Sequence, residues 1–234
     1  MSGEPNPSGS AEIDRAHLAQ QRYRVPRGGR QILLVRHGSS VGPTLETINL
    51  GELTISDPPL SEAGHAQAAA LARHLQGERL ARLFVTPLQR THQTATPLIA
   101  ATGLVPTVID DLREAHLGDW EHSFYIHAEA GHPLLKRMFV EESWEVLPNA
   151  EPMEHFAARV RNGIVAIANL MEPNETAVAF AHAGTIAEIC RQATGSRAFA
   201  FMAPENTSVS RLVINADGVW KLRSFNDVSH LGYD

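Results

Sequence analysis

Short apolar runs separated by amphipathic stretches dominate the hydrophobic pattern of the chain. The first run, Ile32 to Val35, consists of four consecutive apolar and mostly branched residues, which is typical of a strand buried on both faces of a parallel sheet. Later runs predict further strands, of which the last two flank the turn at 215–218. These strands are expected at 83–86, 107–109, 177–181, 208–214 and 219–225.

Helical periodicity fills the stretches between these runs. Ser61 is the expected N-cap of a helix that ends near Gln76, because a hydroxyl there can accept a hydrogen bond from the first helical turn. Further helices are predicted at 87–101, 156–171 and 185–193. Strands that alternate with helices argue for an α/β domain, a three-layer α/β/α sandwich around a mainly parallel sheet.

Three segments lack a regular pattern. Residues 1–29 are rich in proline, glycine and serine, and we expect a partly mobile extension with a short helix near 11–23. Residues 39–59 form a long polar loop, which in a compact domain is usually functional or disordered. Residues 121–150 carry aromatic residues without a clean period, which predicts a cap-like insert in a domain spanning 30–234.

Composition narrows the class of protein. The chain has 234 residues, of which 43% are hydrophobic and 20% charged, as in ordinary globular proteins. No apolar run approaches the roughly 20 residues that span a bilayer, and the net charge of −6 gives no support to nucleic-acid binding. We expect no secretory signal, and the single cysteine, Cys190, fits a cytoplasmic location. The sequence is compatible with a homo-oligomer.

Polar side chains follow three of the predicted strands. Arg36 and His37 come directly after the first strand, Arg90 lies shortly after the second, and His182 follows the strand at 177–181. If these strands are parallel, the four side chains gather at one edge of the sheet. Two guanidinium groups and two imidazoles suit a phosphoryl group, whose oxygens accept several hydrogen bonds. Glu114 is the best-placed carboxylate in the nearby polar loop.

These residues lie in a series of motifs that resembles the histidine phosphatase superfamily, the phosphoglycerate-mutase-like group. The likeness runs from about residue 30 to the C-terminus, with the motifs in the expected order. Ser40 and Ala183 stand where the acid-phosphatase branch has an arginine and an aspartate, so the branch with a glutamate acid fits better. The matching segments are Arg36-His37-Gly38, 57–67, 86–95, 112–121 and 179–184.

The resemblance implies a phosphoglycerate mutase-like fold and a role for each site residue. His37 would be the nucleophile that becomes phosphohistidine, and Glu114 the acid that protonates the leaving oxygen. Arg36, Arg90 and His182 would bind the phosphoryl oxygens. The substrate would be a small phosphorylated molecule, and neither a cofactor nor a metal is implied.

Two assignments within this set keep alternatives. The acid could instead be a neighbour of Glu114 in the same loop, namely Asp111, Asp119 or Glu121. Pro43 stands where mutase-like members place an asparagine, so a hydroxyl from another residue would have to contact the phosphate. The candidates are Ser39, Ser40 and Thr44.

Two rival sites are disfavoured. Six residues separate Cys190 from Arg197, whereas cysteine phosphatases place five between their nucleophile and arginine, so Cys190 is not the expected nucleophile. His122, His127 and His132 repeat every five residues, a spacing that does not keep side chains on one helical face. We therefore expect no metal site in that segment.

Hydrolysis of phosphate monoesters is the leading hypothesis for the activity. A phosphoglycerate mutase and a non-catalytic protein that binds a phosphorylated ligand are the alternatives. Mutases of this group follow the acid glutamate with an arginine and, two places later, a tyrosine, whereas this chain has Ala115 and Leu117. We expect these two residues to make the pocket more apolar and to weaken binding of a glycerate carboxylate.

Overall fold

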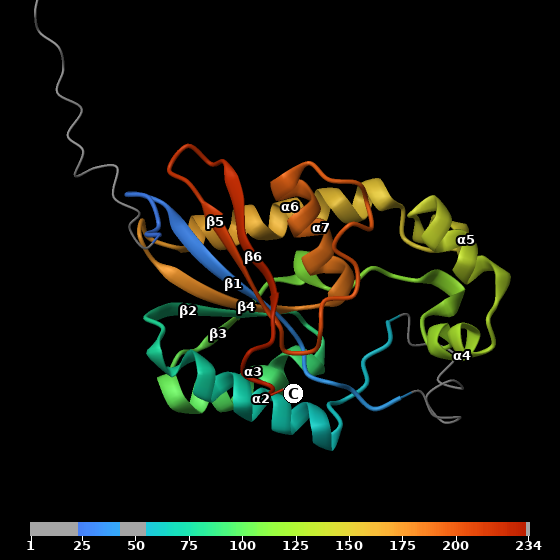
Figure 1. Cartoon of the computed structure of the whole chain (residues 1–234), viewed down its shortest axis with the longest axis horizontal. Coiled ribbons are helices and arrows are strands. Elements are labelled where there is room, and N and C mark those ends of the chain that lie inside the picture. The colour runs from blue at the N-terminus through green and yellow to red at the C-terminus, as the bar shows by residue number, and fades with distance from the viewer. Residues whose placement is uncertain (1–22, 43–54, 233–234) are drawn as a thin grey trace, which may run out of the picture.

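A computed structural model describes residues 23–42 and 55–232. In this part of the chain, a six-stranded sheet in the order β3-β2-β4-β1-β5-β6 lies between two layers of helices (Figure 1). β1 to β4 run parallel, whereas β5 pairs antiparallel to β1, and β6 antiparallel to β5. The strands are β1 (Arg30–Arg36), β2 (Leu80–Val85), β3 (Pro106–Val108), β4 (Thr176–Ala181), β5 (Val209–Ile214) and β6 (Trp220–Asp227).

Helices cover both faces of the sheet, as the pattern predicts. Helices α2 and α3 lie on one face and α6 and α7 on the other (Figure 1). Successive side chains of β1 point to opposite faces of the sheet. Leu33 packs in the core beneath α2 and α3, and Leu34 packs in the core beneath α6 and α7. The α/β/α sandwich is confirmed. These helices span α2 (Glu62–His74), α3 (Gln89–Thr102), α6 (Met153–Leu170) and α7 (Ala183–Thr194).

Predicted and observed boundaries differ mainly at element ends. Ser61 caps α2 as expected, because its hydroxyl accepts a hydrogen bond from the Gly64 N–H at 3.1 Å. α2 gives way at Leu75 to a turn of 3₁₀ helix that ends at Gly77. The second strand begins at Leu80, three residues earlier than predicted. Sequence patterns mark apolar centres better than ends because terminal residues are only half buried.

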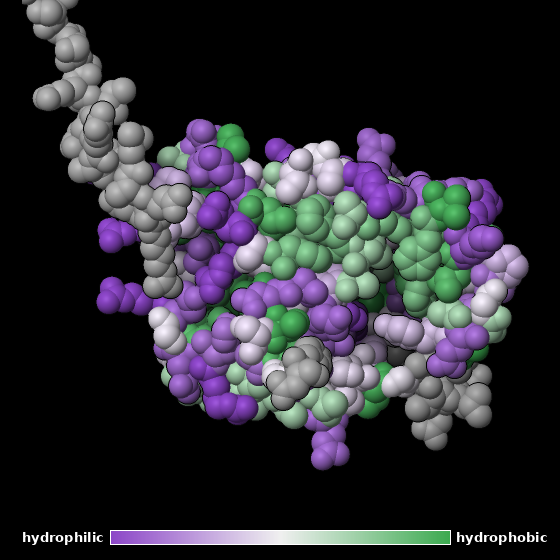
Figure 2. Space-filling view, in the orientation of Figure 1, coloured by the Kyte–Doolittle hydropathy of each residue, from purple (hydrophilic) through white to green (hydrophobic). Residues whose placement is uncertain are grey.

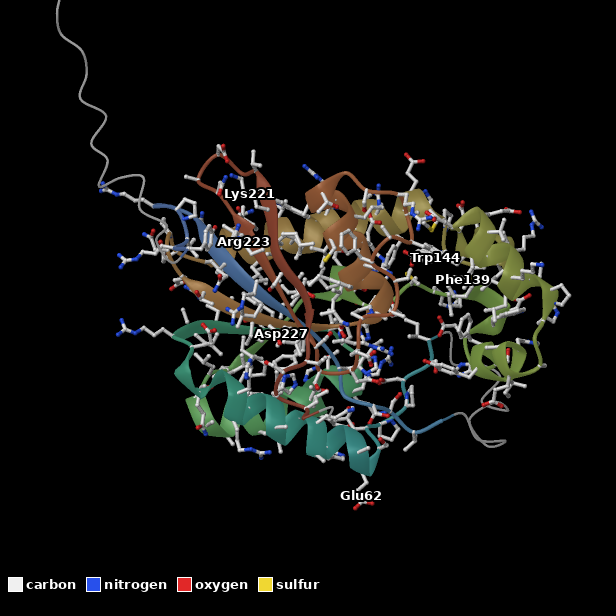
Figure 3. The ribbon with its side chains drawn as sticks, in the orientation of Figure 1. Glu62, Phe139, Trp144, Lys221, Arg223 and Asp227 are labelled. Atoms are coloured by element: carbon white, nitrogen blue, oxygen red, sulfur yellow. The ribbon has the colours of Figure 1, made fainter. Side chains whose placement is uncertain are left out.

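The irregular segment at 121–150 folds into a small helical lobe beside the sheet. It contains α4 (Phe124–Glu129), α5 (Pro133–Glu141) and a turn of 3₁₀ helix at Trp144–Val146 (Figure 1). Trp144 is buried and stacks on the ring of Phe199 at 5.8 Å, and Phe139 meets the same ring edge-on at 6.1 Å. Figure 3 shows Trp144 and Phe139 where the lobe meets the body of the domain.

Some expectations fall on other parts of the chain. The helix predicted near 11–23 lies outside the described residues, except for Tyr23, which is not helical. Thr44, one of the proposed phosphate contacts, also lies outside them. Across 23–42 and 55–232, none of the helices has the length and hydropathy that crossing a membrane requires.

Candidate active site

The carboxyl ends of three neighbouring strands bring the predicted residues to one edge of the sheet. Arg36 ends β1 and His37 follows it, while His182 follows β4 and precedes α7. Arg90 lies in the first turn of α3, just after β2. Because β4 lies between β1 and β2, the side chains converge as parallel pairing predicts. The rings of His37 and His182 are 5.3 Å apart.

A hydrogen bond fixes which ring nitrogen of His37 carries the proton. Its Nδ1 lies 2.8 Å from the carbonyl oxygen of Gly38, and since a carbonyl can only accept, Nδ1 carries the proton and Nε2 the lone pair. Burial, together with the cations of Arg90 and Arg36, lowers the pKa of His37 to about 3, although the Gly38 hydrogen bond opposes the shift. The imidazole is therefore neutral at physiological pH.

Two glycines allow the loop after β1 to press against α2. A Cβ on Gly38 would lie 2.7 Å from the carbonyl oxygen of Gly64, and a Cβ on Gly64 would lie 2.0 Å from that of Ser39. The N–H of Gly38 also donates to the Thr94 hydroxyl at 2.9 Å, which in turn donates to the Arg90 carbonyl at 2.6 Å. Sequence reasoning missed Gly64 and Thr94, which fix His37 relative to Arg90.

Arg90 is buried and surrounded by acidic groups. Its Nη1 donates to the Ser56 carbonyl at 2.9 Å and lies 3.4 Å from an Asp57 carboxylate oxygen. Burial lowers the pKa of Arg90, while the carboxylates of Glu114, Asp57 and Glu121 act in the opposite direction. The guanidinium remains a cation, because the arginine side chain does not lose its proton in proteins.

Two buried nitrogens of the site have no hydrogen-bond partner among the described residues. They are Nδ1 of His182 and Nε of Arg36. The other ends of these side chains are held: Nε2 of His182 lies 2.9 Å from the Thr86 hydroxyl, and Nη1 of Arg36 donates to the Pro204 carbonyl at 2.7 Å. Burial and the nearby Arg90 hold the pKa of His182 well below its usual range. Unpaired buried polar atoms are costly, so these nitrogens suit an oxygen-rich ligand.

The carboxylate of Glu114 sits on the N-terminus of α7. One oxygen accepts the N–H of Gly184 at 3.0 Å, and the other accepts the N–H groups of Ala115 at 3.0 Å and Thr185 at 3.2 Å. The positive end of the helix dipole favours an anion there. A Cβ on Gly184 would lie 2.7 Å from the carboxylate, so the approach requires glycine. Glu114 thereby lies beside the strand end that carries His182.

A buried arginine that sequence reasoning missed holds the loop of Glu114. Arg159 of α6 donates to the carbonyls of Asp111, Arg113 and Glu114 at 2.7–2.9 Å. It also binds both carboxylate oxygens of Glu151, at 2.7 and 2.8 Å. Burial raises the pKa of Glu151, but the hydrogen bonds and charge of Arg159 outweigh this and lower it.

Two of the alternative acids have other contacts. Asp119 accepts a hydrogen bond from the Asn149 amide at 3.0 Å. The oxygens of Glu121 accept the N–H groups of Ser56 and Leu117, both at 2.9 Å. Glu121 thereby supports the same Ser56 segment that contacts Arg90.

A cavity of about 290 Å³ opens at Arg36 and His37. Figure 2 shows the surface hollowed between the body of the domain and the lobe. The amide of Asn206, another residue that sequence reasoning missed, donates to the His37 carbonyl at 2.8 Å. The other lining residues are Ser39, Ser40, Val41 and Gly42 from the loop after β1, and Tyr125 and Glu129 from α4.

The expectation that Ala115 and Leu117 make the pocket more apolar is wrong. Ala115 is buried at 4% exposure within the hydrophobic core, and Leu117 packs against that core. The lobe contributes Tyr125 and Glu129 to the cavity instead, so the wall provided by α4 is polar.

The rival sites lack the required arrangement. His127 stacks on Trp120 at 4.2 Å, and His132 meets the same ring edge-on at 5.0 Å. In the part of the chain that the structure describes, no group of three or more histidine, cysteine or acidic residues is placed to hold a metal ion. Cys190 is buried in α7, and burial raises the pKa of its thiol to about 12, which disfavours the thiolate.

Comparison with known proteins gives the family. The model of the histidine phosphatase superfamily (branch 1) matches residues 32–228. The chain belongs to this superfamily. It is 33% identical over 171 residues to glucosyl-3-phosphoglycerate phosphatase of Mycobacterium tuberculosis, covering 68% of this chain and 73% of that protein. It is also 29% identical over 205 residues to phosphoglycerate mutase-like protein 4 of Arabidopsis thaliana, covering 86% of each.

Solved structures agree with this membership. The native mycobacterial glucosyl-3-phosphoglycerate phosphatase superposes with a TM-score of 0.68 at 26% identity, over 85% of this chain and 99% of that one. The phosphoglycerate mutase of Bacillus anthracis has a TM-score of 0.69 at 21% identity, over 88% and 96%, and so supports the fold alone. As a histidine phosphatase with phosphatase relatives, this protein is a phosphatase.

Proposed function

We propose that the protein hydrolyses phosphate monoesters of small molecules by attack of His37. The observation that carries this proposal is a neutral imidazole whose Nδ1 proton is held by Gly38. His37 lines a cavity that Arg36 also lines, and its Nε2 keeps the lone pair. A histidine held in this way presents the lone pair that a nucleophile requires, and the neighbouring guanidinium groups of Arg36 and Arg90 suit a phosphoryl group as its target.

The reaction has two balanced steps. In the first, Nε2 of His37 forms a bond to phosphorus and the ester P–O bond breaks. Glu114, which takes up a proton as the phosphate dianion enters beside it, gives that proton to the departing oxygen. In the second, water attacks the phosphorus, the bond to Nε2 breaks, and the proton of the water passes to the Glu114 carboxylate. Arg36, Arg90 and His182 stabilise the charge that spreads over the phosphoryl oxygens in both transition states.

We also propose that residues 30–234 form one domain in which 121–150 acts as a cap, preceded by an extension at 1–29. Tyr125 and Glu129 support the cap, since they bring the lobe into the wall of the cavity. A cytoplasmic location is part of the proposal and is supported by the lone buried thiol of Cys190, which suits a reducing compartment.

The experiment is a screen of phosphorylated metabolites for release of inorganic phosphate, with His37→Ala beside the wild type. His155→Ala is the matched control, because His155 is an exposed histidine on α6. We expect His37→Ala to abolish turnover and His155→Ala to keep it. Quenched reactions should contain acid-labile, base-stable phosphate on His37. More than a trace of activity in His37→Ala would show that another group is the nucleophile.

A mutase is the second candidate, favoured by the phosphoglycerate mutase-like relative. A mutase must hold the carboxylate of phosphoglycerate. Among the described residues that line the cavity, Arg36 is assigned to the phosphoryl group and Glu129 adds a negative charge. The protein should therefore release phosphate rather than isomerise 3-phosphoglycerate in the presence of a trace of 2,3-bisphosphoglycerate. Rapid formation of 2-phosphoglycerate without free phosphate would establish the mutase. A non-catalytic binding protein would bind esters and release nothing.

A further inference from the structure

We infer that Glu129 and Tyr125 select the leaving group of the substrate: they favour an amine-bearing alcohol and disfavour one that carries a carboxylate. This inference rests on the proposed function, since it concerns the part of the ester that lies beyond the phosphoryl group. It predicts the order amine, then hydroxyl, then carboxylate among esters of the same size.

The first support is the placement of the two residues. They are four positions apart on α4, and residues at that spacing lie on the same face of a helix. Both line the cavity that contains His37. Tyr125 is 60% exposed, so its ring is accessible to a ligand, and an ammonium group over such a ring gains a cation–π interaction.

The second support is the balance of charge in the cavity. Among the lining residues that the structure describes, Arg36 is the one cation and Glu129 the one carboxylate. Arg36 is assigned to the phosphoryl group, and the Asn206 amide is already bound to the His37 carbonyl. A second negative charge on the ester would thus meet Glu129 without a cation to pair with, whereas an ammonium group would pair with it.

The third support is that α4 is held in place. His127 of α4 stacks on Trp120, which is buried at 5% exposure and continues the loop that carries Glu114. Phe124 of the same helix packs against Trp120 at 6.2 Å. Helix α4, which carries Tyr125 and Glu129, is therefore held by contacts with the core. A rigid support of this kind is what a specificity-determining site requires.

The test uses three two-carbon phosphate esters that differ in one group. They are phosphoethanolamine with an ammonium, 2-hydroxyethyl phosphate with a hydroxyl, and phosphoglycolate with a carboxylate. Comparing ratios of kcat/KM between variants cancels the intrinsic reactivity of each ester. The contact of one exposed charge changes the affinity for a ligand by about two- to fivefold. Glu129 should strengthen binding of the amine ester and weaken binding of the carboxylate ester. Glu129→Gln should lower the amine-to-carboxylate ratio about fivefold, and Glu129→Lys should invert the preference.

Glu172→Lys is the matched control for net charge. Glu172 is exposed and lies in the connection between α6 and β4, whereas His182 follows the other end of β4, so the ratio should stay as in the wild type. Tyr125→Leu should weaken the amine ester alone, while Tyr125→Phe should keep its preference because the ring remains.

Equilibrium binding separates this inference from the proposed function. In a His37→Ala background, calorimetry measures the affinity for each ester without turnover, so the same ratios can be tested even if hydrolysis does not occur. Failure of hydrolysis with the binding order intact would count against the proposed function alone. The inference is wrong if the carboxylate ester binds as tightly as the amine ester, or if Glu129→Lys and Glu172→Lys change the ratio equally.

Discussion

The guanidinium of Arg159 and the carboxylate of Glu151 form a two-point ion pair, at 2.7 and 2.8 Å, directly behind the loop that carries Glu114. Glu151 also accepts the N–H of His116 at 3.2 Å, and its own N–H donates to the His116 carbonyl at 2.8 Å. The pair therefore joins α6, the end of the lobe and the Glu114 loop in one buried polar network.

Removing Arg159 should be severe. Arg159→Ala leaves the Glu151 carboxylate and three loop carbonyls without their donor, and breaking a buried ion pair typically costs about 3–5 kcal/mol. Urea denaturation measures the loss. Arg159→Lys should recover only part of it, because an ammonium cannot bind all five oxygens. Arg161→Ala is the control, since Arg161 lies two positions on and its guanidinium sits over Trp220 at the surface. A similar loss for both alanine variants would contradict the assigned role.

The close approach at Gly64 should make this position intolerant of any side chain. Gly64→Ala places a Cβ 2.0 Å from the Ser39 carbonyl oxygen, so α2 or the loop after His37 must move, and we expect a loss of turnover of at least tenfold. Gly77→Ala is the control, because no atom lies within 4 Å of its Cβ position. Steady-state kinetics on an aryl phosphate distinguishes the two, and equal rates would show that the contact is unimportant.

Acid should destabilise the protein through His37. The pKa of His37 is about 3 in the folded state and about 6.5 in an unfolded chain. Between these values the unfolded state binds the proton and the folded state does not, so stability falls as the pH falls from about 6.5 toward 3. The slope from this residue approaches about 1.4 kcal/mol per pH unit. Denaturation of wild type and His37→Asn at several pH values should show a shallower acid loss in the variant.

The position of Glu114 can be tested separately from its chemistry. Glu114→Gln replaces one acceptor oxygen with an amide nitrogen that faces a main-chain N–H of α7, which should cost about 1–3 kcal/mol of stability. General acids contribute about 10²–10⁴-fold where the leaving group is poor, so alkyl phosphates should lose more than aryl phosphates. An equal loss on both would indicate a binding role, and a normal rate would move the acid to Asp119 or Glu121.

Gly184→Ala displaces the same carboxylate without removing it, because the new Cβ would lie 2.7 Å from Oε1. Like Glu114→Gln, this variant should lose more activity on alkyl phosphates than on aryl phosphates, but the loss should be smaller. Ala183→Gly changes the adjacent residue of α7 without adding an atom and serves as the control. The ratio of alkyl to aryl turnover is the measurement, and an unchanged ratio in Gly184→Ala would separate Glu114 from proton transfer.

Chelators and vanadate test the source of positive charge. Arg36 and Arg90 supply it in the proposed mechanism, so EDTA should leave the rate unchanged. Vanadate should inhibit, because it mimics the pentavalent phosphorus of the transition state. Loss of activity in EDTA that a divalent cation restores would contradict the mechanism.

The sheet and most of the candidate site could be predicted from the sequence. Short runs of apolar residues identify the buried strands. Because β1 and β4 pair in parallel, Arg36, His37 and His182 must lie at the same edge of the sheet. This reasoning needs only the local pattern and the rule for where strands end.

Residues that depend on distant partners could not be predicted. Arg159 lies in an amphipathic helix, where a charged residue usually faces water. It is buried because Glu151, which directly follows the lobe in the chain, lies beside it and pairs with its charge. Tyr125 and Glu129 lie in a segment without periodicity, so no local signal oriented them toward the cavity. Ala115 was placed in the pocket by analogy with mutases, whereas the packing of the core decides its direction.

The unpaired nitrogens of His182 and Arg36 affect the end of the catalytic cycle as well as its beginning. An oxygen that satisfies them in the ester still satisfies them after the ester bond has broken, because the phosphoryl oxygens are the same atoms. Free phosphate should therefore compete with substrate, and its departure should limit turnover for the most reactive esters. The measurement is inhibition by inorganic phosphate, which should be competitive with the ester.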